Sequence, residues 1–246
     1  KLMRDPCIIR KDEGKFHMVW LAGWTERGIG YSSSKDLVSW SEQKYFIVMD
    51  KEPTARNCWA PEIVYDKKAR QFLIFWSTTI PGRFPETETT ADNSYNHRIY
   101  SVTTKDFVSF SDTKLFYDRG FNVIDATIIQ DKKSYVMFVK DETRTPPQKN
   151  IRVTTSKSLY GPYSSPSEPI TGKYWAEGPT AAKIGDWWYL YFDKYTEKKM
   201  GALRSKDLAT WEDVSDKITF PDGMRHGTVF EADEEILSGL QQYKQR

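Results

Sequence analysis

Cysteine and histidine are scarce in this 246-residue sequence. The two cysteines, Cys7 and Cys58, are too few for a disulfide framework or a structural metal site, and we expect both to be buried free thiols. None of the three histidines has the spacing of a zinc ligand relative to another histidine or a cysteine. The sequence therefore argues against a structural zinc site.

Long apolar runs and an excess of charge of one sign are also missing. No run approaches the ~20 residues of a membrane helix, so we expect no membrane insertion. The 36 basic residues nearly balance the 34 acidic ones, and this mixture argues against a nucleic-acid partner. Aromatic residues, in contrast, are abundant at 15%, and aromatic rings can pack against sugar rings as well as fill a core.

Four segments of the chain share one plan. Each begins with a short strand opened by an acidic residue, at Asp5, Glu62, Asp125 and Glu177, followed by a polar turn and an aromatic-rich strand. Each unit then closes with a strand, a Ser/Thr-Lys-Asp type of turn and an aromatic-ended outer strand. Repeats of this kind predict four-stranded antiparallel meanders, which are the blades of a β-propeller.

A fifth unit begins at His226 but changes character within a few residues. Residues 226–230 read as an inner strand, whereas residues 234–240 read as a short terminal helix. We predict one all-β catalytic domain over residues 1–246, a five-bladed β-propeller whose fifth blade is incomplete, with its outer strands expected N-terminal to Lys1. An open four-blade arrangement would leave unpaired strand edges, which natural sheets avoid.

The acidic residues that open the units are predicted to occupy equivalent places at one mouth of the central channel. Such a mouth would gather Asp5, Glu62, Asp125, Glu177 and His226 from five blades. Clustered like charges cost stability and call for a functional reason. Hydrolysis of a glycosidic bond is one such reason, because an inverting enzyme needs one carboxylic acid and one carboxylate, and a neighbouring charge keeps the acid protonated.

Five short motifs resemble the blade signatures of glycoside hydrolase family 43. The motifs are Arg4-Asp5-Pro6, Trp59-Ala60-Pro61-Glu62, Ile124-Asp125-Ala126, Glu177-Gly178-Pro179 and Arg225-His226-Gly227. The resemblance implies an inverting hydrolase of plant polysaccharides such as xylan, with an exo-acting α-L-arabinofuranosidase favoured. A β-xylosidase or another glycosidase of the same fold stays open, as does a sugar-binding propeller without catalysis.

The resemblance also implies roles for the acidic residues. Asp5 would be the general base, Glu177 the general acid, and Asp125 the residue that orients the acid and tunes its pKa. Glu62 would lie at the rim of the pocket and contact sugar hydroxyls, unless it is a buried strand-opening acid. No cofactor is required, although a calcium ion in the central channel is compatible with the family and could be held through water by His226.

Several aromatic and basic side chains near the expected mouth are candidates for sugar contacts. They are Trp24, Trp59, Trp175, Arg98, Arg225 and His226. Each tryptophan can equally be a packing residue, each arginine an ion-pair partner, and the histidine a core residue. The expected partner is an arabinose- or xylose-containing oligo- or polysaccharide. The family implies a periplasmic, extracellular or cell-surface location, and the oligomeric state stays open.

Overall fold

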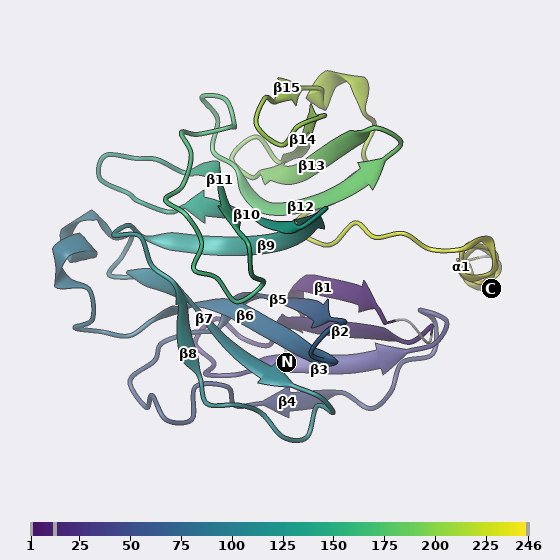
Figure 1. Ribbon diagram of the computed structural model, residues 1–246, viewed down its shortest axis with the longest axis horizontal. Coiled ribbons are helices and arrows are strands. Elements are labelled where there is room, and N and C mark those ends of the chain that lie inside the picture. The colour runs from purple at the N-terminus through teal and green to yellow at the C-terminus, as the bar shows by residue number, and fades with distance from the viewer. Residues whose placement is uncertain (1, 12–13, 245–246) are drawn as a thin grey trace.

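The computed structural model describes residues 2–11 and 14–244, which contain four antiparallel sheets around a common axis (Figure 1). Blade I contains β1 (Arg4–Arg10), β2 (Phe16–Leu21), β3 (Ile29–Ser34) and β4 (Lys44–Phe46). Blade II contains β5 (Trp59–Asp66), β6 (Gln71–Thr79), β7 (His97–Thr104) and β8 (Lys114–Tyr117). Blade III contains β9 (Val123–Asp131), β10 (Ser134–Asp141) and β11 (Asn150–Ser156). Blade IV contains β12 (Glu177–Ile184), β13 (Trp187–Lys194), β14 (Lys199–Ser205) and β15 (Glu212–Asp213).

The strands of each blade follow one another in space in chain order, as the repeats predict. The inner strands β1, β5, β9 and β12 surround the axis, and each of the first three packs against the next. Blade III has an irregular outer edge in place of a fourth strand. There the backbone N–H groups of Ser164, Ser167 and Ile170 donate to carbonyl groups of β11. The fold is therefore a β-propeller.

The core is divided among the junctions between neighbouring blades. Strand side chains alternate between two buried faces, so consecutive residues of one strand enter different clusters. On β6, Phe72 and Ile74 pack toward blade I, whereas Leu73 and Phe75 pack toward blade III. A third cluster, which includes Phe138, joins blades III and IV. Each junction is thus sealed by aromatic and aliphatic side chains, which explains the aromatic-rich second strands.

The prediction of five blades is wrong for the described residues, which form four. The predicted inner strand, residues 226–230, lies between β1 and β12 without pairing as a strand. The hydroxyl of Thr228 accepts from the Ile8 N–H at 3.1 Å and donates to the Pro6 carbonyl at 2.8 Å. On the other side, the Val229 N–H donates to the Thr180 hydroxyl at 3.0 Å. Hydrogen bonds therefore hold this segment in the gap between blades I and IV.

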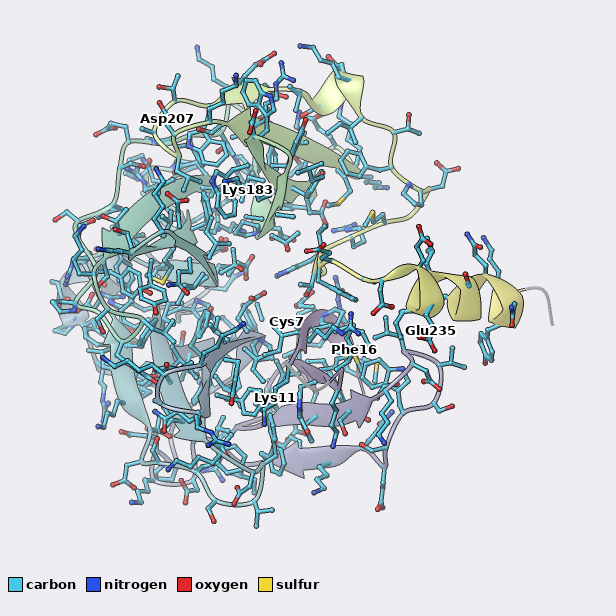
Figure 2. The ribbon with its side chains drawn as sticks, turned by 45° about the vertical axis from the view of Figure 1, so that its right-hand side comes forward. Cys7, Lys11, Phe16, Lys183, Asp207 and Glu235 are labelled. Carbon is cyan, nitrogen blue, oxygen red and sulfur yellow. The ribbon has the colours of Figure 1, made fainter. Side chains whose placement is uncertain are left out.

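The predicted terminal helix is confirmed as α1 (Glu234–Lys244), which follows an extended segment and lies outside the ring of blades (Figures 1 and 2). Two short 3₁₀ helices, η1 (Pro85–Thr90) and η2 (Ser215–Lys217), lie in connections. No helix within the described ranges is long and apolar enough to span a membrane. Cys7 and Cys58 are buried free thiols, as predicted.

Candidate active site

The inner strand of every blade carries a bulge near its start. In each blade two inner-strand residues lie opposite one residue of the second strand. The first bulge residue has a left-handed backbone in all four blades, with φ of 48° at Asp5, 45° at Ala60, 51° at Asp125 and 58° at Gly178. Bulges re-aim side chains and are frequent beside active sites. The bulge thus supplies a common frame for comparing the blades.

In this frame the four predicted acids do not occupy equivalent places, which corrects our expectation. Asp5 and Asp125 are equivalent, because each is the first residue of its bulge. Glu177 precedes its bulge by one position, whereas Glu62 follows its bulge and is equivalent to Cys7. The repeat therefore places carboxyl groups at two depths of the channel.

The acid mouth, as we call it, contains Asp5, Asp125, Glu177 and His226. The Nδ1 atom of His226 lies 3.6 Å from a carboxylate oxygen of Asp5. A carboxylate oxygen of Asp125 accepts the Gly178 N–H at 3.0 Å, which links blade III to the strand that carries Glu177. The structure thus brings together the three residues predicted to be catalytic, and it adds a histidine among them.

Burial and charge pull in opposite directions at this mouth. Burial raises the pKa of Asp125 to about 6, and the charges of His226 and Lys140 offset part of that effect. Burial lowers the pKa of His226, but the carboxylates of Asp125, Asp5, Glu62 and Glu177 outweigh burial and raise it above its ordinary value. The carboxylates therefore favour the protonated imidazole, and this form in turn reduces the repulsion among them.

A chain of charged groups runs from Glu177 into blade III. The ammonium group of Lys140 lies 2.9 Å from Glu177 and 2.6 Å from Glu142. A second ammonium group, of Lys149, lies 2.5 Å from Glu142 and 2.8 Å from Asp92. Both lysine side chains are almost fully buried, and buried charges of this kind need partners on every side. The chain ends in the long insertion between β6 and β7, to which Asp92 belongs.

The second strand of a blade supports the mouth of the next blade. The second-strand residues at this level, opposite the residue before each bulge, are Leu21, Ser77, Lys140 and Asp193. The Ser77 hydroxyl accepts the Asp125 N–H at 3.2 Å. In the same way Lys140 reaches Glu177 of blade IV. Two of the three predicted catalytic residues are therefore held by the preceding blade.

Asp193 extends this pattern to the segment after blade IV. Its carboxylate accepts the Arg225 Nε–H at 2.5 Å, beside His226. This contact identifies Arg225 as an ion-pair partner, one of the two readings that the sequence left open. The guanidinium side chain is still 43% exposed, so it can also face a ligand at the acid mouth.

Glu62 lies in the channel as a buried strand-opening acid, one of the two readings that the sequence left open, and not at the rim of the acid mouth. The middle layer, as we call it, contains Cys7, Glu62, Thr127 and Thr180, which are equivalent residues just after the four bulges. One carboxylate oxygen of Glu62 accepts from the Thr127 hydroxyl at 3.1 Å and from the Cys7 thiol at 3.3 Å. Burial raises the pKa of Glu62 to about 7.

A cavity of about 570 Å³ opens on the far side of the middle layer. It is lined by the later halves of the inner strands, with Phe230 and Asp233 on the side of the gap between blades I and IV. Asp5, Asp125 and Glu177 do not line it. The cavity therefore belongs to the opposite end of the channel, and the chemistry of the acid mouth is not located there. Figure 2 shows Cys7, a middle-layer residue, close to the centre of the ring.

Arg98 is buried, and our expectation of a sugar contact is wrong for this residue. Its side chain is 0% exposed, and its Nε–H donates to Asp118 at 2.5 Å. Its other guanidinium nitrogens contact Asn96 and Thr87 of the long insertion, and the guanidinium lies 4.2 Å from the centre of the Phe84 ring. Arg98 thus anchors the insertion and cannot reach a substrate.

Two aromatic groups flank the acid mouth. On the side of blades I and II, the indole N–H of Trp59 donates to the Trp24 carbonyl at 2.8 Å, and the Trp59 ring stacks on Tyr95 at 4.8 Å. Arg4, the neighbour of Asp5, lies over the Trp24 ring. On the side of blades III and IV, Trp175 packs near Tyr195, whose ring lies 4.6 Å from the Lys140 ammonium. Trp24 is half exposed and free to contact a ligand.

Sequence reasoning missed Lys140, Lys149, Glu142 and the aromatic residues Tyr95 and Tyr195. A signal for Lys140 exists, because it closes the apolar run 135–139 of a strand that is otherwise buried. The other residues lie in loops or at strand ends and carry no recognisable pattern. Among the described residues, no three His, Cys, Asp or Glu side chains are arranged to hold a metal ion. A calcium ion in the channel stays a prediction.

Comparison with known proteins identifies the family. A family model described as "Probable glycosyl hydrolase domain", related to glycoside hydrolase family 43, matches residues 1–235. The chain belongs to this family. An α-L-arabinofuranosidase from Bifidobacterium longum subsp. longum is 25% identical over 179 residues, which are 64% of this chain but 16% of that protein. The chain thus spans about a sixth of the length of its curated relative.

Solved structures with the same fold act on different glycans. An exo-1,5-α-L-arabinanase from a bovine ruminal metagenomic library has a TM-score of 0.64 and 18% identity, over 94% of this chain and 84% of that one. An exo-β-1,3-galactanase from Phanerochaete chrysosporium has a TM-score of 0.66 and 12% identity, over 87% of this chain and 50% of that one. At such identities the similarity shows the fold alone.

Proposed function

We propose that this glycosyl hydrolase domain is an inverting glycosidase, with Asp5 as general base and Glu177 as general acid. In one step the proton of Glu177 moves to the glycosidic oxygen, the bond from that oxygen to the anomeric carbon breaks, and water attacks the carbon from the opposite face. The attacking water gives its proton to Asp5. Asp125 touches neither reacting oxygen and acts on Glu177 through its charge.

The observation that carries this proposal is the graded exposure of the three carboxyl groups. The side chain of Glu177 is 25% exposed and that of Asp5 is 15% exposed, whereas Asp125 is a buried residue. The two groups that must touch substrate and water are therefore the accessible ones. The buried group lies against the backbone of the strand that carries Glu177, where a negative charge favours the protonated form of a neighbouring acid.

For the substrate we propose a terminal α-L-arabinofuranosyl unit of a plant polysaccharide. The curated arabinofuranosidase relative and the fold shared with an arabinanase support this choice. Half-exposed Trp24 offers a ring face against which a sugar can pack. A polymeric substrate of this type would be met in the periplasm or outside the cell. A β-xyloside is the second candidate, because the same acid mouth serves either sugar.

The first experiment is hydrolysis of 4-nitrophenyl α-L-arabinofuranoside and 4-nitrophenyl β-D-xyloside by the full-length protein, with NMR of the first-formed anomer. Release of arabinose with inverted configuration is the expected result. Release of xylose instead would replace the proposed sugar. Retained configuration would overturn the roles of Asp5 and Glu177, and binding of either glycan without release would favour a sugar-binding propeller.

Glu177→Gln tests the acid directly. The variant should lose about 10²–10⁴-fold in kcat on methyl α-L-arabinofuranoside, because a poor leaving group needs a proton. It should lose much less on the nitrophenyl glycoside, whose leaving group departs without one. Equal losses on both substrates would remove Glu177 from the role of acid.

A further inference from the structure

The carboxyl group of Glu177 lies under two opposite influences from the same blade. Asp125, on β9, places a carboxylate against the Gly178 N–H, beside Glu177. Lys140, on β10, places an ammonium group 2.9 Å from the Glu177 carboxylate. A neighbouring negative charge favours the protonated carboxyl group, whereas a neighbouring positive charge favours the ionised form. A group that must deliver a proton therefore has a close partner that opposes protonation.

The surroundings of Lys140 limit that opposition. Its ammonium group also lies 2.6 Å from Glu142, so its charge is shared between two carboxylates. Burial lowers the pKa of Lys140, but Glu177, Glu142 and Asp125 outweigh burial and raise it above its ordinary value. Lys140 is thus a permanent cation with a fixed position. Because the Lys140 side chain is only 2% exposed, water can reach its contact with Glu177 only from the side of the carboxyl group.

The remaining charged groups near Glu177 do not duplicate this contact. Asp193 on β13 is the cross-strand partner of Glu177, but its carboxylate is paired with Arg225. Among these groups, the close contact of His226 is with Asp5, 3.6 Å from its Nδ1 atom, and not with Glu177. Tyr195, which follows β13, lies against Lys140. Among the described residues, Lys140 is therefore the cation that contacts Glu177.

We propose that Lys140 is a positioning residue for Glu177. It holds the carboxyl group at the mouth of blade IV and, with Glu142 as its counter-charge, sets the upper pH at which that group can donate a proton. This inference rests on the proposed role of Glu177 as general acid. Blade III would then act on the carboxyl group of Glu177 through two residues of opposite charge, Asp125 and Lys140.

The test is the pH profile of kcat/KM for Lys140→Met and Lys149→Met in the full-length protein. The two lysines are matched, because both are buried and both pair with Glu142, but only Lys140 contacts Glu177. In K140M the alkaline limb of the profile should move to higher pH, because the ionised form of Glu177 loses its partner. In K149M the limb should stay at the wild-type pH.

Orientation has its own measurement. In K140M, kcat for methyl α-L-arabinofuranoside should fall by about tenfold more than kcat for the nitrophenyl glycoside, because a misplaced acid harms only the substrate that needs it. Lys140→Arg keeps the charge and should restore the wild-type alkaline limb. If K140M does not fold, both measurements are made on the K140M/E142Q variant instead. This double variant removes one charge of each sign, so no buried charge of the Lys140–Glu142 pair is left without its partner.

The inference is overturned if K140M keeps the wild-type limb and the wild-type ratio between the two substrates. It is also overturned if K149M shifts the limb as far as K140M does, since the effect would then be one of general charge. Failure of the proposed function looks different, because E177Q would then lose activity equally on both substrates.

Discussion

The acid mouth and the middle layer lie next to each other in one channel, and each contains carboxyl groups, yet the two are built differently. At the mouth, Glu177 lies beside Lys140 and Asp5 beside His226, and both acids keep contact with solvent. In the middle layer, Glu62 is bound by two neutral donors and is buried, at the end of the cavity that opens on the far side. The difference teaches that position relative to the bulge decides which partners an acid of this repeat meets, charged groups at the mouth and neutral donors in the middle layer.

The largest expected difference between the two layers is in turnover. Asp5→Asn should lower kcat by about 10²–10⁴-fold on every substrate, because the attacking water loses its base. Asparagine adopts the left-handed backbone of this position readily, so the fold should persist. Steady-state kinetics and urea unfolding measure the two effects. Asp131→Asn, at the far end of β9, is the control and should keep full turnover, whereas a D5N variant within tenfold of wild type would contradict the assignment.

Glu62 of the middle layer should instead affect how the free energy of unfolding depends on pH. The pKa of Glu62 is raised by burial to about 7 from its ordinary value of 4.5, so the folded protein binds this proton more tightly than the unfolded chain. Stability from this group is complete below pH 4.5 and is lost as the pH rises through 7. In the wild type, the free energy of unfolding should therefore fall by about 3 kcal/mol as the pH rises from 4.5 to above 7. In Glu62→Gln, which cannot ionise at this position, that decrease should be absent.

Urea unfolding of E62Q and wild type at pH 4.5 and pH 8 measures this effect, with kcat as the control. Turnover should stay within about threefold of wild type, because Glu62 lies below the mouth. An unchanged pH dependence, or a collapse of turnover, would erase the distinction between the two layers.

Gly178 offers a smaller test at the boundary between blade IV and the acid mouth. Its φ is +58°, and an added Cβ would lie 2.4 Å from the His226 ring. Gly178→Ala should cost about 1–3 kcal/mol and lower turnover, because the imidazole must move away from Asp5. Gly185→Ala is the matched control, since it has φ of +59° and no atom within 4 Å of the added Cβ. Equal losses in the two variants would show that backbone strain alone accounts for the effect.

The smallest effect is expected within the middle layer. Thr127→Val removes one of the two donors to Glu62 and should cost about 1 kcal/mol in the free energy of unfolding. Thr127→Ser keeps the hydroxyl group and should cost less. Turnover should be unchanged in both variants. A loss of turnover in T127V alone would place Glu62 in the chemistry and join the two layers into one site.

Much of the fold could be predicted because the repeat is strong. Aromatic-rich second strands and polar turns mark four blades, and the same features seal the junctions between them. The number of blades was wrong, because an apolar start at residues 226–230 does not become a strand without neighbours to pair with. Pairing is a property of the surrounding edges, which a local pattern does not contain.

The register of the acids was wrong for a different reason. Aligning the repeats on their acidic residues ignores the bulge, which inserts one residue into each inner strand. Alignment on Pro6, Pro61 and Pro179 would have given the observed register, because each proline is the second bulge residue of its blade. The burial of Arg98 was beyond reach of either alignment, since its partners come from distant loop positions.

The support that each blade receives from its predecessor has a consequence for how the protein can fail. Glu177 and Asp125 acquire their places only when blades III and IV, and blades II and III, have docked. Activity therefore depends on contact between adjacent blades. It should be lost when a single junction between blades opens, even though circular dichroism still shows intact strands. Measurements of secondary structure would not detect molecules with one open junction. Only a lower specific activity would reveal them.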